Sequence, residues 1–383
     1  MAIQLFMPAF QIEECLAEIR ECLEKGWTGL GYKTIEFEEA WKDYSGHENA
    51  HFLSSATAGL HQAVKILKRQ YNWRDGDEII TTPITFVSSN HAILYENMVA
   101  RFADVDQYLC LDPHSVKSRI NEKTRAVLFV GYGGSFGQLN EIIEICREYG
   151  LKLILDAAHM AGSRVKGKFP GVFDGIDVTV YSFQAVKNLP TADSGMICFK
   201  DPEMDAVCRK MTWMGINKDT YARFNKAGNY KWNYDVEFVG YKHHGNSIMA
   251  AIGLVQLKYL ERDNAYRRQI CNWYDDFFAG NDDVKPIPVT YRADCSRHLY
   301  AICVPDRDGL IEHLNSLEIY PGVHYTDNTE YEIYAYDHGK CPHAHEVCRH
   351  ILSLPLHMRL SFDDVRIISG AVNAYTTSML TLI

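Results

Sequence analysis

The feature that most constrains the fold is an alternation of short apolar runs with amphipathic stretches between residues 50 and 200. Such alternation is typical of α/β layering, in which helices cover a mostly parallel sheet. A helix is expected over residues 58–70, where Leu60, Val64 and Leu67 fall on one face, and another over 139–149, ended by Gly150. The expected strands are residues 50–53, 78–82, 99–103, 126–130, 151–155 and 178–181.

The composition and periodicity of the sequence change after about residue 200. Residues 212–245 are rich in Trp, Tyr, Asn, Gly and His and have little periodicity, which predicts a long irregular segment of the kind that is often functional or interfacial. A long helix is expected from about Ser247 towards Phe278, followed by a mixed region. A chain of 383 residues favours two domains, and we predict a large domain at 1–245 and a small C-terminal domain at 246–383.

Composition excludes several classes of protein. No uncharged apolar run reaches the roughly 18 residues that cross a bilayer, and residues 1–14 lack the pattern of a signal peptide, so we expect no membrane partner and a cytoplasmic location. The net charge of −10 argues against nucleic acid as the main partner, since a phosphate-binding surface would need clustered Lys and Arg.

The cysteines predict thiols rather than disulfides. Their number is odd, at eleven, and no Cys-x-x-Cys pair occurs, which fits a reducing compartment. One dense patch runs from Cys341 through His343, His345 and Cys348 to His350. None of the usual zinc spacings is met there, so we expect no metal in this chain.

Three chemically distinctive groups stand where predicted strands end. Asp156 follows the strand at 151–155, Ser182 follows the strand at 178–181, and Lys187 lies five residues further. The stretch Ser55-Ala56-Thr57 separates a strand from a helix, where free N–H groups suit a phosphate. Open α/β sheets bind ligands at this edge.

This combination matches the needs of pyridoxal phosphate. That cofactor takes a lysine for a Schiff base, an aspartate for its pyridinium nitrogen and a helix N-terminus for its phosphate. Taken singly, the groups have more ordinary interpretations: a solvated lysine, a turn aspartate and an N-capping serine. Their occurrence together and in this order favours the cofactor.

The sequence resembles the DegT/DnrJ/EryC1/StrS family of pyridoxal-phosphate-dependent nucleotide-sugar aminotransferases over nearly its whole length. The most specific matches are the block Asp156–Gly162 and the stretch from Ser182 to Gly195. Other matches are Phe37-Glu38, Tyr44-x-Gly46, Ser55–Leu60, Gly76–Ile80, Pro83–Phe86, Asp104-Val105-Asp106 and Ala250–Leu257. The resemblance implies an aspartate-aminotransferase-like (fold type I) α/β architecture: a mostly parallel seven-stranded sheet in a three-layer α/β/α large domain, with a smaller α+β C-terminal domain.

The resemblance also implies roles for particular residues. Lys187 matches the lysine that forms the internal aldimine, and Asp156 matches the partner of the pyridinium nitrogen. Phe86 matches the aromatic residue that stacks on the cofactor ring, and His159 occupies the position near its phenolic oxygen. His324-Tyr325 matches a His-Tyr pair near the substrate.

The cofactor phosphate is expected to lie against Ala56, Thr57 and Ser182. The family typically has Gly-x-Asn-Tyr-Arg where this chain has Gly240-Tyr241-Lys242-His243-His244, and that Asn reaches the phosphate in the neighbouring subunit's site. Lys242 takes its place here, which implies a homodimer with active sites at the subunit interface. Other departures from the family pattern are Ala56 for Gly, Asp193-Ser194-Gly195 for Glu-Gly-Gly, and His244 for Arg.

Lys187 also bears on the reaction, because the family's dehydratases carry His at this position. Its presence favours transamination, with an amino acid such as L-glutamate as donor and Lys187 carrying the proton. The loop Asn188-Leu189-Pro190-Thr191 is similar to that of the family's 4-aminotransferases. It favours a nucleotide-linked 4-keto-6-deoxyhexose as acceptor, in lipopolysaccharide, capsule or other glycoconjugate synthesis.

Two alternatives stay open at the level of sequence. The aromatic and histidine density of residues 221–245 could suit an unlinked ketosugar such as a keto-octulosonate or a cyclitol. A non-catalytic, cofactor-binding regulator is less favoured, since regulators of this fold carry a DNA-binding domain and no basic helix-turn-helix precedes the enzyme-like blocks.

Overall fold

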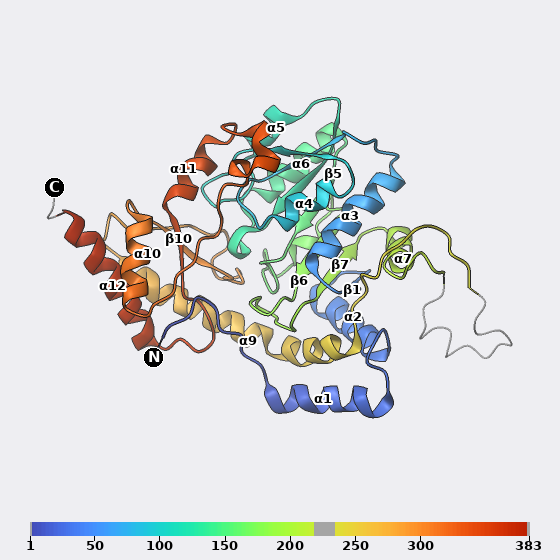
Figure 1. The fold of residues 1–383 in the computed structure, drawn as a ribbon, viewed down its shortest axis with the longest axis horizontal. Coiled ribbons are helices and arrows are strands. Elements are labelled where there is room, and N and C mark those ends of the chain that lie inside the picture. The colour runs from blue at the N-terminus through green and yellow to red at the C-terminus, as the bar shows by residue number, and fades with distance from the viewer. Residues whose placement is uncertain (1, 218–233, 381–383) are drawn as a thin grey trace.

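The fold is built on a seven-stranded sheet. A computed structural model describes residues 2–217 and 234–380 (Figure 1). The strand order is β1-β7-β6-β5-β4-β2-β3, and only β7 runs antiparallel to its neighbours. The strands are β1 (His51–Leu53), β2 (Glu78–Thr81), β3 (Val99–Phe102), β4 (Thr124–Val130), β5 (Lys152–Asp156), β6 (Val178–Ser182) and β7 (Gly195–Phe199). The six strands expected from the sequence are confirmed within two residues, and β7 is an addition to them.

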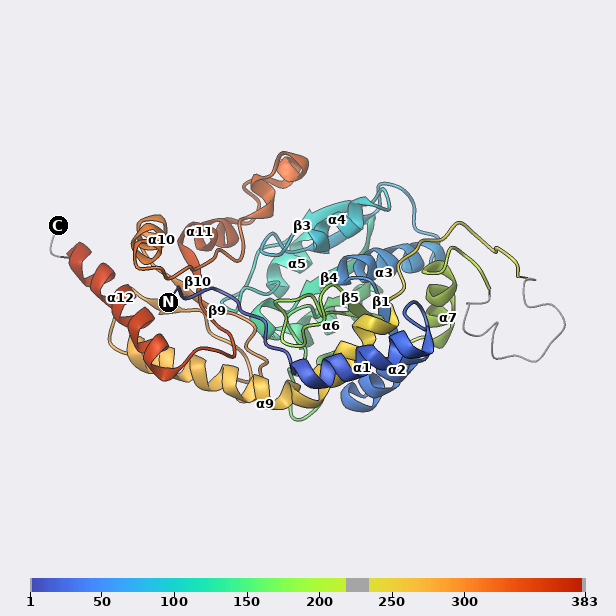
Figure 2. The same cartoon turned by 60° about the horizontal axis from the view of Figure 1, so that its bottom comes forward.

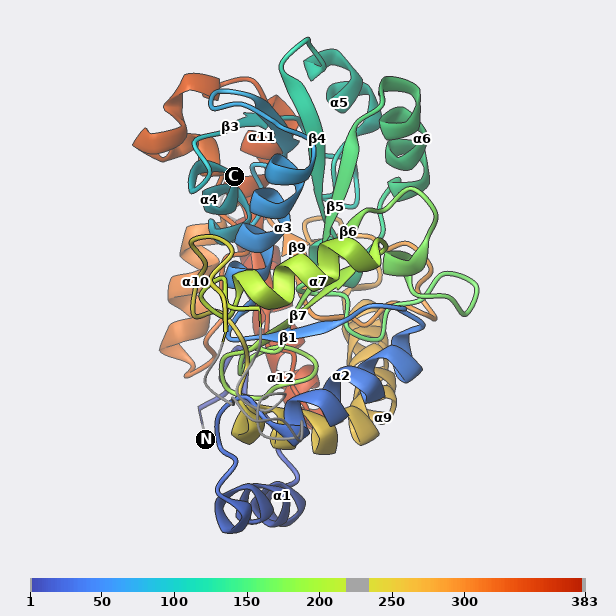
Figure 3. The same ribbon diagram turned by 90° about the vertical axis from the view of Figure 1, so that its right-hand side faces the viewer.

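Helices cover this sheet, and their ends follow local sequence signals. The helix expected at 139–149 is α6 (Leu139–Tyr149), and Gly150 ends it in the left-handed conformation at φ 66°. Asp112 and Asp201 cap α5 (Pro113–Arg119) and α7 (Pro202–Met211), each of which begins with proline. Figure 3 shows α7 beside β7 and β1, which it contacts. The remaining helices here are α1 (Ile12–Lys25), α2 (Tyr32–Ser45), α3 (Ala56–Gln70) and α4 (Ser88–Leu94).

One long helix joins the two parts of the molecule. The expected helix is α9 (Ser247–Phe278), which packs on α2 near its start and on α12 (Phe362–Leu380) further along (Figure 1). Figure 2 shows α1 lying along the start of α9, which it contacts. The C-terminal elements are the three-stranded sheet β8 (Lys285–Pro286), β9 (Tyr300–Cys303) and β10 (Ile351–Leu354), with α10 (Arg307–Ser316) and α11 (Pro342–His350).

Apolar side chains form two cores, and α9 contributes to both. Ala250 and Leu260 belong to the core around the seven-stranded sheet, whereas Ile270 and Tyr274 belong to a second core with β9, β10, α10 and α12. Near the N-terminus, Ile3 pairs with Ile319 beside the second core. The division at residue 245 stays a prediction, since both ends of the chain contribute to packing across it.

Three other expectations concern the chain as a whole. All eleven cysteines lie among the described residues as free thiols, and every one except the half-buried Cys303 is buried. Across residues 2–217 and 234–380, no helix combines the length and the apolar character needed to cross a membrane. The irregular segment expected at 212–245 lies partly outside the described residues, which omit 218–233.

Candidate active site

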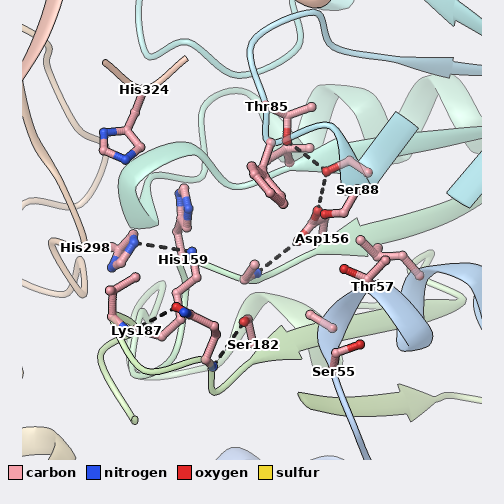
Figure 4. A pocket seen from close by; sticks show the side chains of 18 of the residues that line it. Ser55, Thr57, Thr85, Ser88, Asp156, His159, Ser182, Lys187, His298 and His324 are labelled. Carbon is pink, nitrogen blue, oxygen red and sulfur yellow. Dashed lines mark hydrogen bonds between the residues drawn. The ribbon is translucent and has the colours of Figure 1, made fainter. Parts of the chain in front are cut away.

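A cavity of about 470 Å³ opens at the carboxyl ends of β5 and β6 and beside the first turn of α3 (Figure 4). It brings together all the site residues predicted from the sequence except Lys242. These are Ala56, Thr57, Phe86, Asp156, His159, Ser182, Lys187, His324 and Tyr325. Five different stretches of the chain therefore meet at one edge of the sheet, where α/β folds bind ligands.

Asp156 ends β5 and is almost completely buried, at 3% exposure. Its Oδ2 accepts a hydrogen bond from Ser89 Oγ at 2.7 Å, and its Oδ1 accepts one from the Ala158 N–H at 3.1 Å. Burial raises the pKa of this carboxyl, and the two donors, together with Lys187, act in the opposite direction. The carboxylate is thus fixed in orientation and aimed into the cavity.

Lys187 lies in the turn between β6 and β7 and faces the same cavity. Desolvation lowers the pKa of its ammonium to about 8, although the Asp156 charge favours the protonated form. An amine with a pKa near 8 is partly neutral at physiological pH and is therefore available as a nucleophile and proton acceptor.

His298 lies within hydrogen-bonding distance of Lys187 Nζ and was not predicted from the sequence. The Lys187 Nζ lies 3.4 Å from His298 Nε2, and His298 Nδ1 lies 2.9 Å from Asn188 Oδ1. Asn188 Nδ2 donates to the carbonyl of Ser296 at 2.8 Å, which fixes its Oδ1 as an acceptor. His298 therefore carries its proton on Nδ1 and presents the lone pair of Nε2 to the lysine.

His159 packs beside His298 in the opposite tautomer. The two ring centres are 4.3 Å apart. His159 Nδ1 accepts from the Gly133 N–H at 3.2 Å, so its Nε2 carries the proton and donates to Tyr325 Oη at 3.1 Å. Burial and the nearby Lys187 charge hold the pKa of both histidines well below the ordinary value, which keeps both rings neutral.

The first turn of α3 offers backbone donors to the cavity. Ser55 caps the helix, because its Oγ accepts from the Ala58 N–H at 3.1 Å. Within the described part of the chain, the N–H groups of Ala56 and Thr57 donate to no acceptor. Ser182 ends β6 on the same side of the cavity. Gly195 allows this approach, since a Cβ there would lie 2.7 Å from the Ala56 nitrogen.

Phe86 and the pair His324-Tyr325 line the more open part of the cavity. Phe86 is 61% exposed, and its ring centre is 6.5 Å from that of Tyr325. His324 Nδ1 lies 3.0 Å from Ser353 Oγ, and burial lowers the pKa of His324 to about 4. Phe6, from the N-terminal segment, stacks on His298 with ring centres 5.6 Å apart. No local sequence signal identifies Phe6 as a cavity residue.

Lys242 lies away from this cavity. Its side chain is exposed, and its Nζ stands 3.4 Å from the centre of the Trp213 ring. The residue therefore does not reach the cofactor site of its own chain. Its contact with a neighbouring subunit's phosphate site stays a prediction.

Comparisons with known proteins agree with this geometry. The model of the DegT/DnrJ/EryC1/StrS aminotransferase family matches residues 10–373. A dTDP-4-dehydro-2,3,6-trideoxy-D-glucose 4-aminotransferase from Saccharopolyspora spinosa is 33% identical over 374 residues, covering 96% of this chain and 95% of that protein.

Two solved structures share the fold. The aminotransferase TlmJ from Streptoalloteichus hindustanus superposes with a TM-score of 0.89 at 32% identity, over 99% of this chain and 100% of that one. Spr1654 from Streptococcus pneumoniae, described as a sugar aminotransferase and solved in its PMP form, gives a TM-score of 0.90 at 27% identity, over 100% and 99% of the chains. The fold type I α/β architecture is thereby confirmed. This chain is an aminotransferase and belongs to the DegT/DnrJ/EryC1/StrS aminotransferase family.

Proposed function

We propose that this enzyme uses pyridoxal phosphate to move an amino group from L-glutamate to the keto group of a nucleotide-linked sugar, with a 4-keto-6-deoxyhexose as the favoured acceptor. The observation that carries the proposal is the meeting of Lys187, Asp156 and the free N–H groups of α3 in one cavity of about 470 Å³. The similar 4-aminotransferase from Saccharopolyspora spinosa, named for a dTDP-linked substrate, supports the acceptor class.

The residues of the cavity fit the cofactor in charge and in size. The N–H groups of Ala56 and Thr57, together with the Ser182 hydroxyl, would hold a phosphate at the positive end of the α3 dipole. Asp156 is a buried carboxylate of fixed orientation, suited to a protonated ring nitrogen. The exposed Phe86 would lose solvent contact by covering a ring.

When bound, pyridoxal phosphate supplies an aldehyde that carries the amino group and a ring that withdraws electrons from the carbon being deprotonated. The protein supplies positioned proton carriers. Lys187 Nζ is placed to accept a proton from the donor carbon and to give it back during the transfer of the amino group. His298 Nε2 is fixed as a hydrogen-bond acceptor for that Nζ, and so orients it in both protonation states.

His159 and Tyr325 form a second pair with a fixed direction. Since His159 donates to Tyr325 Oη, the phenolic hydrogen of Tyr325 is left to donate to a bound ligand. Tyr325 is partly buried, and desolvation raises its pKa, which keeps it protonated and a donor over the working pH range. We propose that this hydroxyl donates a hydrogen bond to an oxygen of the bound sugar or cofactor.

The proposal includes a homodimer in which Lys242 reaches the neighbouring subunit's phosphate. Exposed apolar side chains on α1, namely Ile12, Leu16 and Leu23, support an interface on this face. The buried free thiols support the expected cytoplasmic location. Glycoconjugate synthesis is the expected use of an amino sugar product. Light scattering of the purified protein tests whether a dimer forms. If Lys242 reaches the neighbouring subunit's phosphate, Lys242→Ala should weaken cofactor binding while the protein stays dimeric.

The substrate test follows the nitrogen itself. Purified enzyme is incubated with ¹⁵N-labelled L-glutamate and either a dTDP-linked 4-keto-6-deoxyhexose or the same ketosugar without nucleotide. The proposal predicts labelled amino sugar from the nucleotide-linked acceptor only. Equal labelling of the free ketosugar would favour the unlinked-sugar alternative, and no labelling with any acceptor, in protein that retains cofactor, would favour the binding-protein alternative.

A further inference from the structure

Two histidines and two carboxylates converge outside the active-site cavity, where the segment after Tyr325 meets α11. His345 Nδ1 lies 3.4 Å from Asp327 Oδ2 and 3.1 Å from Glu330 Oε1. Glu330 Oε1 also lies 3.3 Å from His338 Nδ1. Ligand atoms of Asp327, Glu330 and His345 all fall within 4.8 Å of one another. Among the described residues, neither carboxylate pairs with a lysine or arginine.

The spacing of these atoms fits a tetrahedral metal site. Zinc bonds to histidine and carboxylate of about 2.0–2.2 Å place neighbouring ligand atoms about 3.3–3.6 Å apart. The two contacts of His345, at 3.4 Å to Asp327 and 3.1 Å to Glu330, are close to that range, and the three ligand atoms all lie within 4.8 Å of one another. Buried histidine and carboxylate pairs elsewhere in the chain are tighter hydrogen bonds, at 2.9 Å for His51 with Glu38 and 2.8 Å for His61 with Glu96. Across residues 2–217 and 234–380, no such hydrogen bond is formed by His345.

Asp327 is held in place for such a role. The residue is 3% exposed, and its Oδ1 accepts from the Thr329 N–H at 2.8 Å and from Thr329 Oγ1 at 2.7 Å. Its Oδ2 receives no hydrogen bond from the described residues and is directed towards His345. The Asp327 carboxylate is costly to leave charged at this low exposure, and a bound cation would stabilise it. With neutral imidazoles the cluster carries two negative charges, which a divalent cation would neutralise.

We propose that Asp327, Glu330 and His345 bind one divalent transition-metal ion of the zinc class, with water completing the coordination and His338 lying beside Glu330. Mixed imidazole and carboxylate ligands suit such ions. Only His345 belongs to the cysteine and histidine patch for which the sequence predicted no metal. Cys341 and Cys348 are buried in the core, and His343 Nδ1 lies 2.9 Å from the Val105 carbonyl.

The site would connect α11 to the segment that delivers Tyr325 to the active site. Asn328, beside Asp327, donates to the Thr85 carbonyl at 3.0 Å and accepts from Asn90 Nδ2 at 2.9 Å. A metal at the cluster would therefore hold this segment between α11 and α4. Its role is structural and independent of the proposed sugar substrate.

The test uses the full-length enzyme after removal of metals with a chelator. Zinc chloride is added in a calorimetric titration to the wild-type protein and to His345→Ala and Glu330→Gln, whose side chains are 44% and 40% exposed and so tolerate replacement. The control is His350→Ala on the same helix, because within the described part of the chain His350 pairs with the single carboxylate of Glu346, at 3.1 Å. We expect one equivalent of zinc in the wild type and the control, and binding at least about tenfold weaker in the other two.

Two further measurements decide whether these residues are the metal ligands. Zinc should raise the thermal midpoint of the wild type and of His350→Ala, and leave that of His345→Ala unchanged. Cobalt in place of zinc should show tetrahedral bands without sulfur-to-metal charge transfer, since the proposed ligands are nitrogen and oxygen. The proposal is overturned if the wild type binds no zinc stoichiometrically, if His345→Ala binds it equally well, or if cobalt reports a thiolate.

Discussion

Lys187 Nζ lies 3.4 Å from His298 Nε2, a nitrogen that the hydrogen bond between His298 Nδ1 and Asn188 keeps free of a proton. The relationship joins residues 111 positions apart. It gives the lysine a neutral acceptor, so that the ammonium is oriented without a second negative charge beside that of Asp156. The aminotransferase thus holds its proposed proton carrier against an imidazole of fixed tautomer, under the influence of a carboxylate.

This arrangement predicts opposite tautomers for two neighbouring histidines. In protein labelled with ¹⁵N in histidine, His298 should be protonated on Nδ1 and His159 on Nε2. Because burial holds both pKa values well below the ordinary value, these neutral forms should persist below pH ~6, where an exposed histidine becomes charged. The variants His298→Gln and His159→Gln assign the signals. The reverse tautomer at His298 would remove its role as an acceptor.

The lowered pKa of Lys187 predicts how cofactor capture depends on pH. In enzyme stripped of pyridoxal phosphate, the rate of capture should rise with pH and level off above about 8, as the amine becomes neutral. In Asp156→Asn the plateau should begin at lower pH, because the charge that favours the ammonium is gone. Stopped-flow absorbance measures both profiles, and a wild-type plateau reached only near the ordinary lysine pKa would contradict the prediction.

The lowered pKa of Lys187 also makes the free energy of unfolding depend on pH in a definite direction. The folded pKa of about 8 is below the unfolded value, so between these values the unfolded chain binds more protons and the contribution of Lys187 to stability rises with pH. Lys187→Met should therefore be more stable than the wild type near pH 7, by ~1–2 kcal/mol since the cavity admits some water. The difference should shrink as the pH approaches 10. Urea unfolding of the cofactor-free proteins checks this, and a constant difference would refute it.

Loss of the hydrogen bond that Ser89 donates to Asp156 should lower catalytic activity. Ser89→Ala removes the 2.7 Å hydrogen bond to Oδ2, and burial then raises the carboxyl pKa with less opposition. We expect kcat/KM to fall about tenfold, in keeping with one hydrogen bond to a charged group. Asp156→Asn should cost roughly 10²–10³-fold. Steady-state kinetics of both variants give these values, and a Ser89→Ala enzyme as poor as Asp156→Asn would mean that Ser89 has another role.

The close approach of β7 to α3 predicts a localised stability effect. In Gly195→Ala the new methyl group would meet the Ala56 nitrogen at 2.7 Å and the Ser55 carbonyl carbon at 2.8 Å, both of them backbone atoms. We expect a loss of ~1–3 kcal/mol in unfolding free energy and weaker cofactor phosphate binding. Gly29→Ala, where a Cβ meets nothing within 4 Å, should change stability by less than ~0.5 kcal/mol. Equal effects in the two variants would contradict the steric argument.

The sequence predicts those parts of the fold and site that are coded locally. The strands carrying Asp156 and Ser182 are apolar runs, and the loop with Lys187 follows one of them. The antiparallel β7 lies outside the expected strands, since only Ile197 and Phe199 of its five residues have a high strand propensity.

Other features depend on residues that meet only in three dimensions. His298 reaches Lys187 from just before β9, and Phe6 reaches His298 from the N-terminus. Neither pairing has a spacing that a motif could encode. The proposed metal ligands have the same character, because Asp327 and Glu330 meet His345 through the turn of η4 (Glu332–Asp337) and not through a zinc motif.

The most direct test of the central claim is the visible absorption spectrum of the purified enzyme before and after L-glutamate is added. The account predicts a visible band from cofactor bound at Lys187, converted by L-glutamate to a near-ultraviolet form, and a loss of that conversion by at least roughly 10²-fold in rate in Lys187→Ala. A protein that stays colourless after incubation with pyridoxal phosphate, or a Lys187→Ala variant that converts as fast as the wild type, would contradict it.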